Sequence, residues 1–261
     1  MVFCWASSIG GCDGGPSREH IISEGILSLF SGVGVHGFPW CRDAPKTVGP
    51  SSLTSHVLCE RHNSELSSTD AAAITLFTIL RNHHDPATPC YPHPVSLDGF
   101  ALERWLLKSS ISVSLQESEP PAWPKPWGKV PVPRELALVA FDASRLCLRR
   151  GLYWRGIVGQ SFVSEDRLDI TPCVGRDGSV GGFRWAFRGL QLYLWLHPTD
   201  TLVEVFPRHT VIAGETGSSL IYRPNGMTLR RPPALFCEFR FLWGVGAPNN
   251  EMQQTAENRG G

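Results

Sequence analysis

The chain has 261 residues, of which 42% are hydrophobic and 18% are charged, as in folded globular proteins that form one large domain or two small ones. Its 24 Lys and Arg residues are balanced by 24 Asp and Glu residues, which argues against a protein that coats nucleic acid through a general basic excess. No apolar run approaches the ~20 residues that a membrane-crossing helix needs, so we expect no membrane contact.

Cysteine usage bears on location and on metal binding. The chain holds eight cysteines, and its first residues lack the basic and apolar regions of a secretory signal. In a reducing compartment cysteines bind metals more often than they form disulfides. We therefore expect a cytoplasmic protein whose cysteines include metal ligands.

The first segment with evident chemistry is residues 4–20, which read CWASSIGGCDGGPSREH. Cys4 and Cys12 are soft ligands beside glycines that permit the tight backbone of a ligand loop. Glu19 and His20 then continue into two isoleucines, which we expect to be buried. Taken alone, His20 could equally be a surface histidine beside a strand.

Residues 24–58 carry mixed signals, and we expect them to form an insertion that ends in a short strand at residues 56–58. Cys41 and His36 lie in this insertion, and either could replace a member of a zinc-binding set. The alternative is a packed thiol and an exposed imidazole, because free cysteine often behaves as a small buried hydrophobic residue.

The second segment with evident chemistry is residues 59–63, which read CERHN. Thiolate and imidazole groups suit zinc, whereas the carboxylate of Glu19 and the amide of Asn63 suit magnesium or manganese. The residue types thus indicate two metals. The predicted zinc ligands are Cys4, Cys12, Cys59 and His62.

Two short motifs in these segments resemble those of the HNH nucleases, the ββα-metal family. They are Glu19-His20-Ile21-Ile22 and Cys59-x-x-His62-Asn63, and the resemblance covers roughly the first 70 residues. Many members read Cys-x-x-Cys, then Asp-His or Glu-His followed by aliphatic residues, then Cys-x-x-Cys-Asn. This chain differs in its wider first cysteine pair, in a histidine as the last zinc ligand, and in a glutamate as the acid.

The resemblance implies an HNH endonuclease that hydrolyses phosphodiester bonds of nucleic acid, with DNA as the expected substrate. Glu19 and Asn63 would hold the catalytic Mg²⁺ or Mn²⁺, His20 would act as general base, and the zinc would be structural. It also implies that residues 59–63 open the helix of a ββα unit. The competing hypothesis is a noncatalytic zinc-stabilised scaffold that presents the C-terminal part of the chain to a partner.

Two helices follow in the predicted order. Ser67 or Ser68 is expected to cap a buried helix over residues 70–80. The sequence His83-His84-Asp85 after it is expected to be a solvated helix end, with a further metal ligand as the alternative. In the next helix, residues 100–108, one face is apolar, and three residues are expected to face solvent: Glu103, Arg104 and Lys108.

The rest of the chain divides at a proline-rich segment, residues 116–133, which we interpret as a linker. Residues 1–115 would form the HNH-like domain with its packed helices. Residues 134–246 would form a helix followed by an antiparallel β-rich domain, a small sandwich or barrel. Its arginines could bind nucleic acid or simply keep the sheet soluble. The whole is an α+β fold, and residues 247–261 are expected to be a disordered tail.

Overall fold

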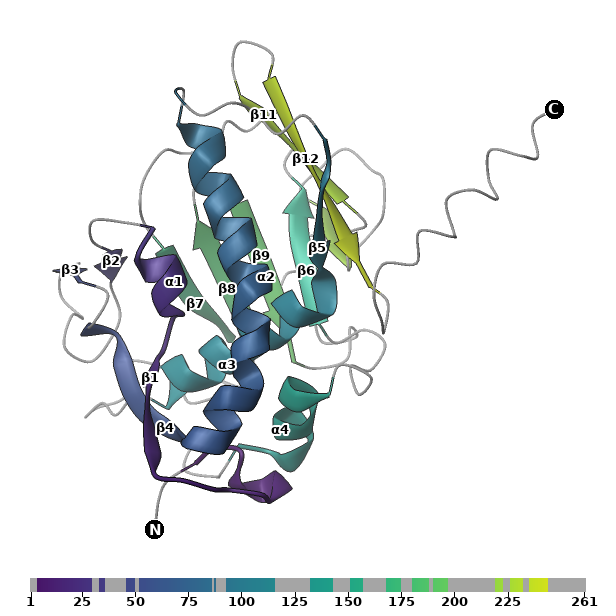
Figure 1. Cartoon of the computed structure of the whole chain (residues 1–261). Coiled ribbons are helices and arrows are strands. Elements are labelled where there is room, and N and C mark those ends of the chain that lie inside the picture. The colour runs from purple at the N-terminus through teal and green to yellow at the C-terminus, as the bar shows by residue number, and fades with distance from the viewer. Residues whose placement is uncertain are drawn as a thin grey trace.

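A computed structural model describes these parts of the chain: residues 4–29, 33–35, 46–49, 52–85, 87, 93–115, 132–142, 151–156, 168–174, 180–187, 190–196, 219–222, 226–231 and 235–243. They form a mixture of helices and mainly antiparallel sheets, which confirms the predicted α+β class (Figure 1). Among the described helices, none has both the length and the apolar character to span a membrane.

The N-terminal elements surround a two-stranded antiparallel sheet. A 3-10 turn, η1 (Ser7–Ile9), precedes β1 (Pro16–His20), which pairs with β4 (Thr54–Cys59). The buried pair Ile21 and Ile22 follows β1, as predicted, and leads into the short helix α1 (Glu24–Leu27). Within the predicted insertion, β2 (Val33–Val35) pairs with β3 (Lys46–Val48) in a separate sheet. Cys41 and His36 lie outside the described residues.

The long helix α2 (Glu60–His84) begins directly where β4 ends (Figure 1). The predicted cap at Ser67 or Ser68 is therefore wrong, because the helix already runs through both positions and Cys59 precedes its first residue. The Ser67 hydroxyl donates to the carbonyl of Ser64 at 2.7 Å, a bond that a serine inside a helix can make. Residues 60–66, which were expected to belong to a separate helix opening at 59–63, are thus the first two turns of the same helix as residues 67–84.

The C-terminal end of α2 also differs from its prediction. His83 is buried, with 4% of its surface exposed, so the predicted solvated end is wrong at this residue. Its burial follows from tertiary packing, since α2 contacts both β5 and β11. Asp85 is exposed after the helix and accepts the backbone N–H of Ala87 at 2.9 Å.

The next helix is longer and more buried than its sequence suggests. β5 (Val95–Asp98) leads into α3 (Gly99–Ser114), whose start is capped by Asp98, which accepts the N–H of Ala101. The prediction that Glu103 and Lys108 face solvent is wrong, because both are buried. Glu103 accepts the backbone N–H of Leu152 at 2.6 Å, and Lys108 pairs with acidic groups of the N-terminal part.

The C-terminal half supplies one helix and two sheets. α4 (Arg134–Phe141) is followed by a five-stranded antiparallel sheet in the order β10-β6-β9-β8-β7. Its strands are β6 (Gly151–Gly156), β7 (Leu168–Val174), β8 (Val180–Phe187), β9 (Leu190–Trp195) and β10 (Ser219–Tyr222). The second sheet contains β11 (Gly226–Arg231), β12 (Leu235–Leu242) and β5, and β12 pairs with β5 in parallel. That parallel pairing joins the two predicted domains and was not expected.

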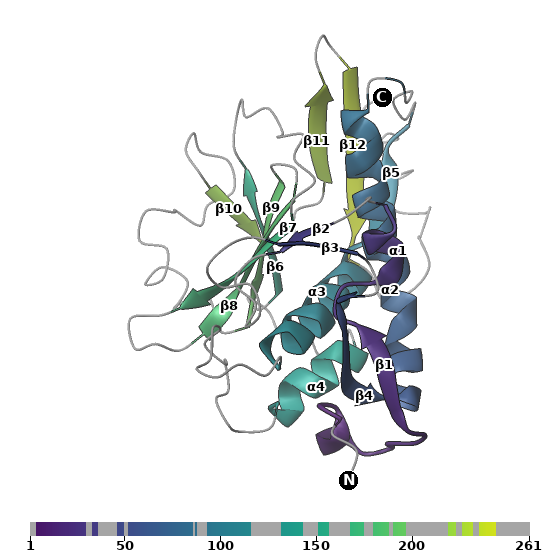
Figure 2. The same ribbon diagram turned by 90° about the vertical axis from the view of Figure 1, so that its left-hand side faces the viewer.

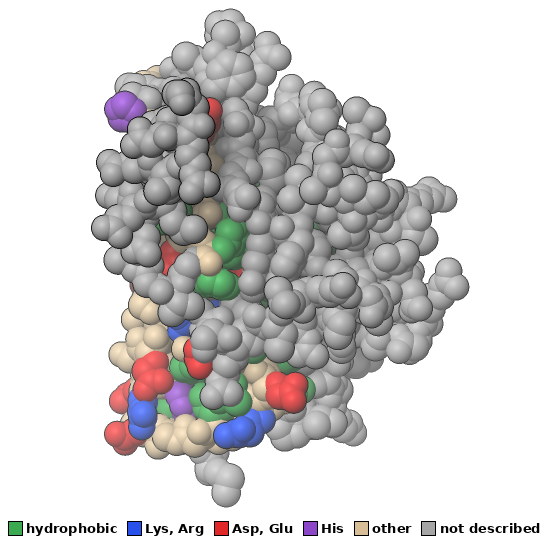
Figure 3. Space-filling model, turned by 90° about the vertical axis from the view of Figure 1, so that its right-hand side faces the viewer, with side chains coloured by type: hydrophobic (Ala, Val, Ile, Leu, Met, Phe, Trp, Pro, Cys, Tyr) green, Lys and Arg blue, Asp and Glu red, His purple; other side chains and the backbone are tan. Residues whose placement is uncertain are grey.

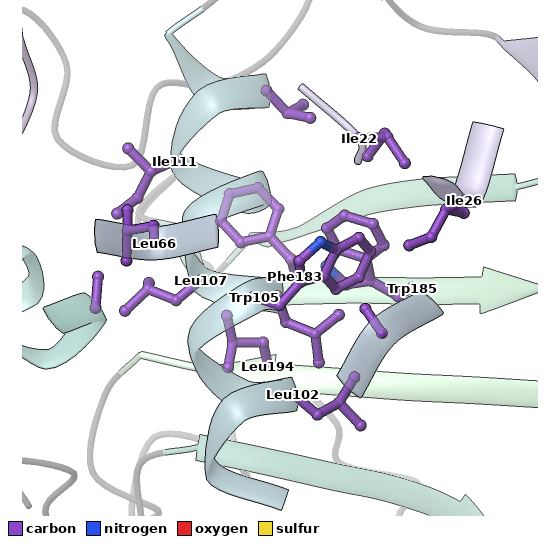
Figure 4. Packing of buried hydrophobic residues seen from close by; sticks show 14 of the residues in the cluster. Ile22, Ile26, Leu66, Leu102, Trp105, Leu107, Ile111, Phe183, Trp185 and Leu194 are labelled. Atoms are coloured by element: carbon purple, nitrogen blue, oxygen red, sulfur yellow. The ribbon is translucent and has the colours of Figure 1, made fainter. Parts of the chain in front are cut away.

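Helix α3 lies between the five-stranded sheet and α2, and the β1–β4 pair lies beside α2 (Figure 2). Trp105 of α3 packs against Trp185 of β8 with ring centroids 5.2 Å apart, and the Trp185 indole donates to Ser110 at 3.2 Å. Phe77 of α2 contacts Phe187 with centroids 4.7 Å apart. Buried residues from both halves belong to one cluster, part of which is shown in Figure 4.

The predicted boundary and tail fall largely outside the described residues, which include only 132 and 133 of the linker and none of residues 247–261. The division into 1–115 and 134–246 as independently folding units stays a prediction. The shared cluster gives that prediction a direct test.

We expect Trp185→Ala to lower the free energy of unfolding by ~3–5 kcal/mol, as for other buried aromatic residues. Because Trp185 joins the five-stranded sheet to α3, helical signal and any metal bound at the N-terminal cluster should be lost in one transition. Urea unfolding followed by circular dichroism and metal release measures this. Leu242→Ala, at a residue 38% exposed, is the control and should change little. A variant in which the N-terminal part keeps the wild-type midpoint would instead show two independent domains.

Candidate metal centre

The four predicted zinc ligands converge on one point near the N-terminus. The ligand atoms of Cys4, Cys12, Cys59 and His62 all lie within 4.8 Å of one another. From the Nδ1 atom of His62, the three Sγ atoms lie at 3.3, 3.7 and 3.2 Å. A tetrahedral zinc with Zn–S of ~2.3 Å and Zn–N of ~2.0 Å requires S···N edges of ~3.5 Å. The cluster therefore has the donor set and the spacing to hold a metal ion such as zinc.

The ligand loop explains why the first cysteine pair is so widely spaced. The 3-10 turn η1 occupies residues between Cys4 and Cys12, so the chain makes a full turn before it returns to the site. Gly11 and Gly14 both adopt φ of +73°, which favours glycine, and allow the loop to close against the start of α2. The N–H of Trp5 donates to the carbonyl of Val57 at 3.0 Å and ties the loop to β4.

The second pair is positioned by the junction of β4 and α2. Cys59 ends the strand, and His62 lies one helical turn later on the same side of the helix. The His62 ring meets the edge of Phe141 at 5.1 Å, and Phe141 also packs against Trp5. Three of the four ligands are buried, whereas Cys12 is exposed. The site is thus sheltered by aromatic residues on one side and open at a single thiol.

Burial sets the protonation of the ligands when no cation is bound. It raises the pKa of the Cys4 thiol to about 12 and lowers the pKa of His62, which favours the neutral imidazole that binds metals. Burial also raises the pKa of Cys59, but hydrogen bonds from the backbone of His62 and Asp13 and from the other two thiols more than reverse this effect. A bound cation would compensate the buried thiolates, so metal binding and proton release are linked.

Two of the predicted catalytic residues, Glu19 and His20, lie on β1, and the third, Asn63, lies in the first turn of α2. In β1–β4, Pro16 pairs with Cys59 at the metal end, while His20 pairs with Thr54 at the far end. Asn63 follows the ligand His62, and its amide donates to the Ser17 hydroxyl at 2.9 Å. His20 is half-buried, and among the described residues no hydrogen bond joins it to Asn63. The structure thus brings Asn63 to the middle of β1 rather than directly to His20.

Glu19 has a cationic partner that the sequence did not suggest. Its carboxylate is 3% exposed, and Oε1 lies 3.0 Å from the ammonium of Lys108, which is also 3.5 Å from Asp70. Asp70 accepts from the Ser23 hydroxyl at 2.7 Å, and Ser23 in turn accepts from the indole of Trp105 at 2.6 Å. This set, which we call the buried charge network, joins β1, α2 and α3. One signal was present: Lys108 is the only charged residue from 105 to 115.

The buried charge network carries two acids and one base. Burial raises the pKa of Glu19 above its ordinary value, against the lowering effect of the Lys108 ammonium, and nearby Asp70 raises it further. Neither carboxylate oxygen of Glu19 accepts a well-aligned hydrogen bond from the described residues. Among the described residues, Lys108 is thus the cation that stabilises its charge.

Comparison with known proteins adds nothing to this geometry: no family model, no curated protein and no solved structure matches the chain. The metal-ligand cluster itself is therefore the main functional indication.

The surface beside the metal cluster carries charges of both signs. Figure 3 shows acidic and basic side chains around a histidine and hydrophobic groups at the lower end of that face. Arg61, next to the ligand His62 in sequence, forms an exposed ion pair with Glu65, and their Nε and Oε1 atoms lie 2.8 Å apart. The described residues on this face do not form the uniformly basic surface that a nucleic-acid backbone attracts.

We expect purified protein to contain about one zinc per chain, because a Cys₃His set fills the tetrahedral shell of a structural site. Cys59→Ser should lose most of this zinc and lower the melting temperature, since structural zinc contributes its binding energy to folding. Elemental analysis and thermal unfolding measure the two effects. Cys173→Ser, at a buried thiol on β7 outside the cluster, should keep full zinc. Equal zinc content in wild type and Cys59→Ser would contradict the assignment of Cys59 as a zinc ligand.

We expect Lys108→Met to lower the free energy of unfolding by ~3–5 kcal/mol, because it leaves the Glu19 carboxylate buried without a cation. The folded-state pKa of Glu19 is already raised, and loss of the ammonium raises it further. The folded variant therefore takes up a proton that the unfolded chain binds less tightly. Its deficit relative to wild type should be greatest at neutral pH and shrink as the pH falls toward the ordinary carboxyl range.

Urea unfolding of both proteins between about pH 5.5 and 8 measures this, with each comparison made at one pH so that effects of metal release cancel. The matched control is the double variant Glu19→Gln with Lys108→Met, which should recover stability and lose the pH dependence. A deficit of the single variant that stays constant with pH would show that the lysine acts through its packing alone.

Proposed function

We propose that the chain is a zinc-stabilised, HNH-type endonuclease that hydrolyses phosphodiester bonds of nucleic acid, with DNA as the expected substrate. The observation that supports this most is the path of the chain around the metal cluster. β1 pairs antiparallel with β4, β4 runs directly into α2, and the cluster joins all three. This order of strand, strand and helix is the arrangement that the ββα-metal resemblance implies.

In this proposal the imidazole of His20 is the general base. It lies at the end of β1, half-buried, where water and a substrate phosphate can reach it. An imidazole near neutral pH can take a proton from the attacking water while the bond to the leaving oxygen breaks. Cys4, Cys12, Cys59 and His62 would hold a structural zinc, which would stabilise the strand pair on which His20 lies and supply no chemistry to this step.

The second divalent cation stays a prediction. When bound, Mg²⁺ or Mn²⁺ would stabilise the charge that develops on the phosphate. Asn63 offers a carbonyl oxygen for it, but Glu19 is buried against Lys108, so a cation there would have to replace the ammonium. The donor set is therefore incomplete in this arrangement, and no step is assigned to the cation.

One observation favours the competing scaffold hypothesis. The carboxylate of Glu19 already has a cationic partner, and a noncatalytic protein could keep such a pair for structure alone. The scaffold hypothesis, however, assigns no role to the half-buried His20 at the end of β1. The activity of His20 variants separates the two hypotheses.

We expect His20→Ala to lower the rate of nucleic-acid cleavage by ~100- to 10,000-fold, the usual contribution of a general base. Zinc content and melting temperature should stay near the wild-type values, because His20 is not a ligand of the cluster. Nicking of supercoiled plasmid in the presence of Mg²⁺ or Mn²⁺ measures the rate.

The matched control is His93→Ala, at an exposed histidine that precedes β5, which should cleave like wild type. Equal cleavage by wild type and His20→Ala, with both folded, would contradict the assignment of the base. Absence of cleavage by well-folded wild type with either metal would favour the scaffold.

A further inference from the structure

Arg18 lies on the face of β1 that is turned away from the buried charge network. Successive side chains of a strand point to opposite faces, so the buried Glu19 separates two outward neighbours, Arg18 and His20. Arg18 is exposed and His20 is half-buried, which agrees with this alternation, although the pairing with β4 shifts its register between Ser17 and Glu19 and leaves Arg18 without a paired residue. The proposed base therefore shares its face of the strand with a guanidinium group.

A hydrogen bond to β4 holds Arg18 close to His20. The Nε atom of Arg18 donates to the Thr54 hydroxyl at 3.3 Å, and Thr54 is the residue that pairs with His20 across the sheet. The side chain therefore reaches along the strand pair toward His20. Because this bond uses Nε, the two terminal nitrogens of the guanidinium remain for a ligand. Such a planar fork matches the oxygens of a phosphate group.

The positive charge of Arg18 has no acidic partner among the described residues. Arg61 on α2 differs in this respect, since Glu65 lies 2.8 Å from it. The nearest acid in sequence, Glu19, points into the protein and pairs with Lys108. An anion that approaches the outward face of β1 thus meets a cation that no described acid compensates, next to the half-buried imidazole.

We propose that Arg18 binds a phosphate group of the nucleic-acid backbone and so places the substrate at His20. This inference rests on the proposed function, because it gives the same site its substrate contact. Arg18 contacts the phosphate, and Thr54 is a positioning residue that acts through Arg18. The contact reads the backbone rather than the bases, so it should serve all sequences equally.

Removal of the charge and removal of its support should have different effects on binding. Arg18→Gln should weaken binding of a labelled DNA duplex about 10-fold and reduce the slope of log K against log salt by ~0.9, the amount expected for one phosphate contact. Thr54→Val keeps the charge but removes the hydroxyl that holds Nε. It should weaken binding by only ~5-fold, as for one hydrogen bond, and leave the salt slope unchanged.

The experiment measures fluorescence anisotropy of the duplex across a salt series without added Mg²⁺ or Mn²⁺, and plasmid cleavage with the metal added. For Arg18→Gln, cleavage should show a raised KM, with zinc content and melting temperature unchanged. The matched control is Arg61→Gln, an exposed arginine whose charge Glu65 already compensates, and it should keep the wild-type salt slope.

The outcomes separate this inference from the proposed function. Cleavage by wild type together with an unchanged KM, affinity and salt slope in Arg18→Gln would overturn the role of Arg18 and leave the nuclease standing. Binding that depends on Arg18 without any cleavage would overturn the nuclease and support the phosphate contact. Wild type that neither binds nor cleaves nucleic acid would overturn both.

Discussion

The convergence of three thiols and an imidazole is the constraint on which the N-terminal part of the structure depends. The cluster joins the loop before β1, the end of β4 and the first turn of α2, which are far apart in sequence. The two strands of β1–β4 are too few to be stable alone in water. A metal at this point would fix both the register of the pair and the start of the helix. The positions of Arg18 and His20 on β1 would then depend on the end of the strand pair that the metal fixes.

The buried charge network is a second constraint, and it acts on the buried face of β1 through Glu19. A lysine and a carboxylate inside a core lose their hydration, and their attraction repays this loss only in part. The pKa of Glu19 is raised because the loss of hydration on burial outweighs the attraction of the Lys108 ammonium. In exchange the network links β1 to α3, and Trp105 continues the link to Trp185 in the five-stranded sheet. The position of His20 is thus coupled to the core that both halves share.

Features that depend on neighbours in sequence were predictable, and features that depend on distant contacts were not. The four candidate metal ligands could be predicted because each pair is local in sequence, and a helix followed by antiparallel strands was expected after residue 133. The pairing of β12 with β5 joins segments about 140 residues apart, and no local pattern reports it. Lys108 was misplaced for the same reason: its charge predicts solvent, while its burial depends on Glu19 and Asp70.

The two faces of β1 differ in charge, and this difference bears on both proposed functions. On the inner face, the acid that would hold a catalytic cation already has an ammonium beside it. On the outer face, a guanidinium and an imidazole stand together, and no described carboxylate pairs with the guanidinium. Arg61 on α2 differs, because the carboxylate of Glu65 lies 2.8 Å from its Nε atom. We propose that the outer face binds an anionic ligand, and within the proposed function a phosphodiester is the ligand on which His20 would act as general base.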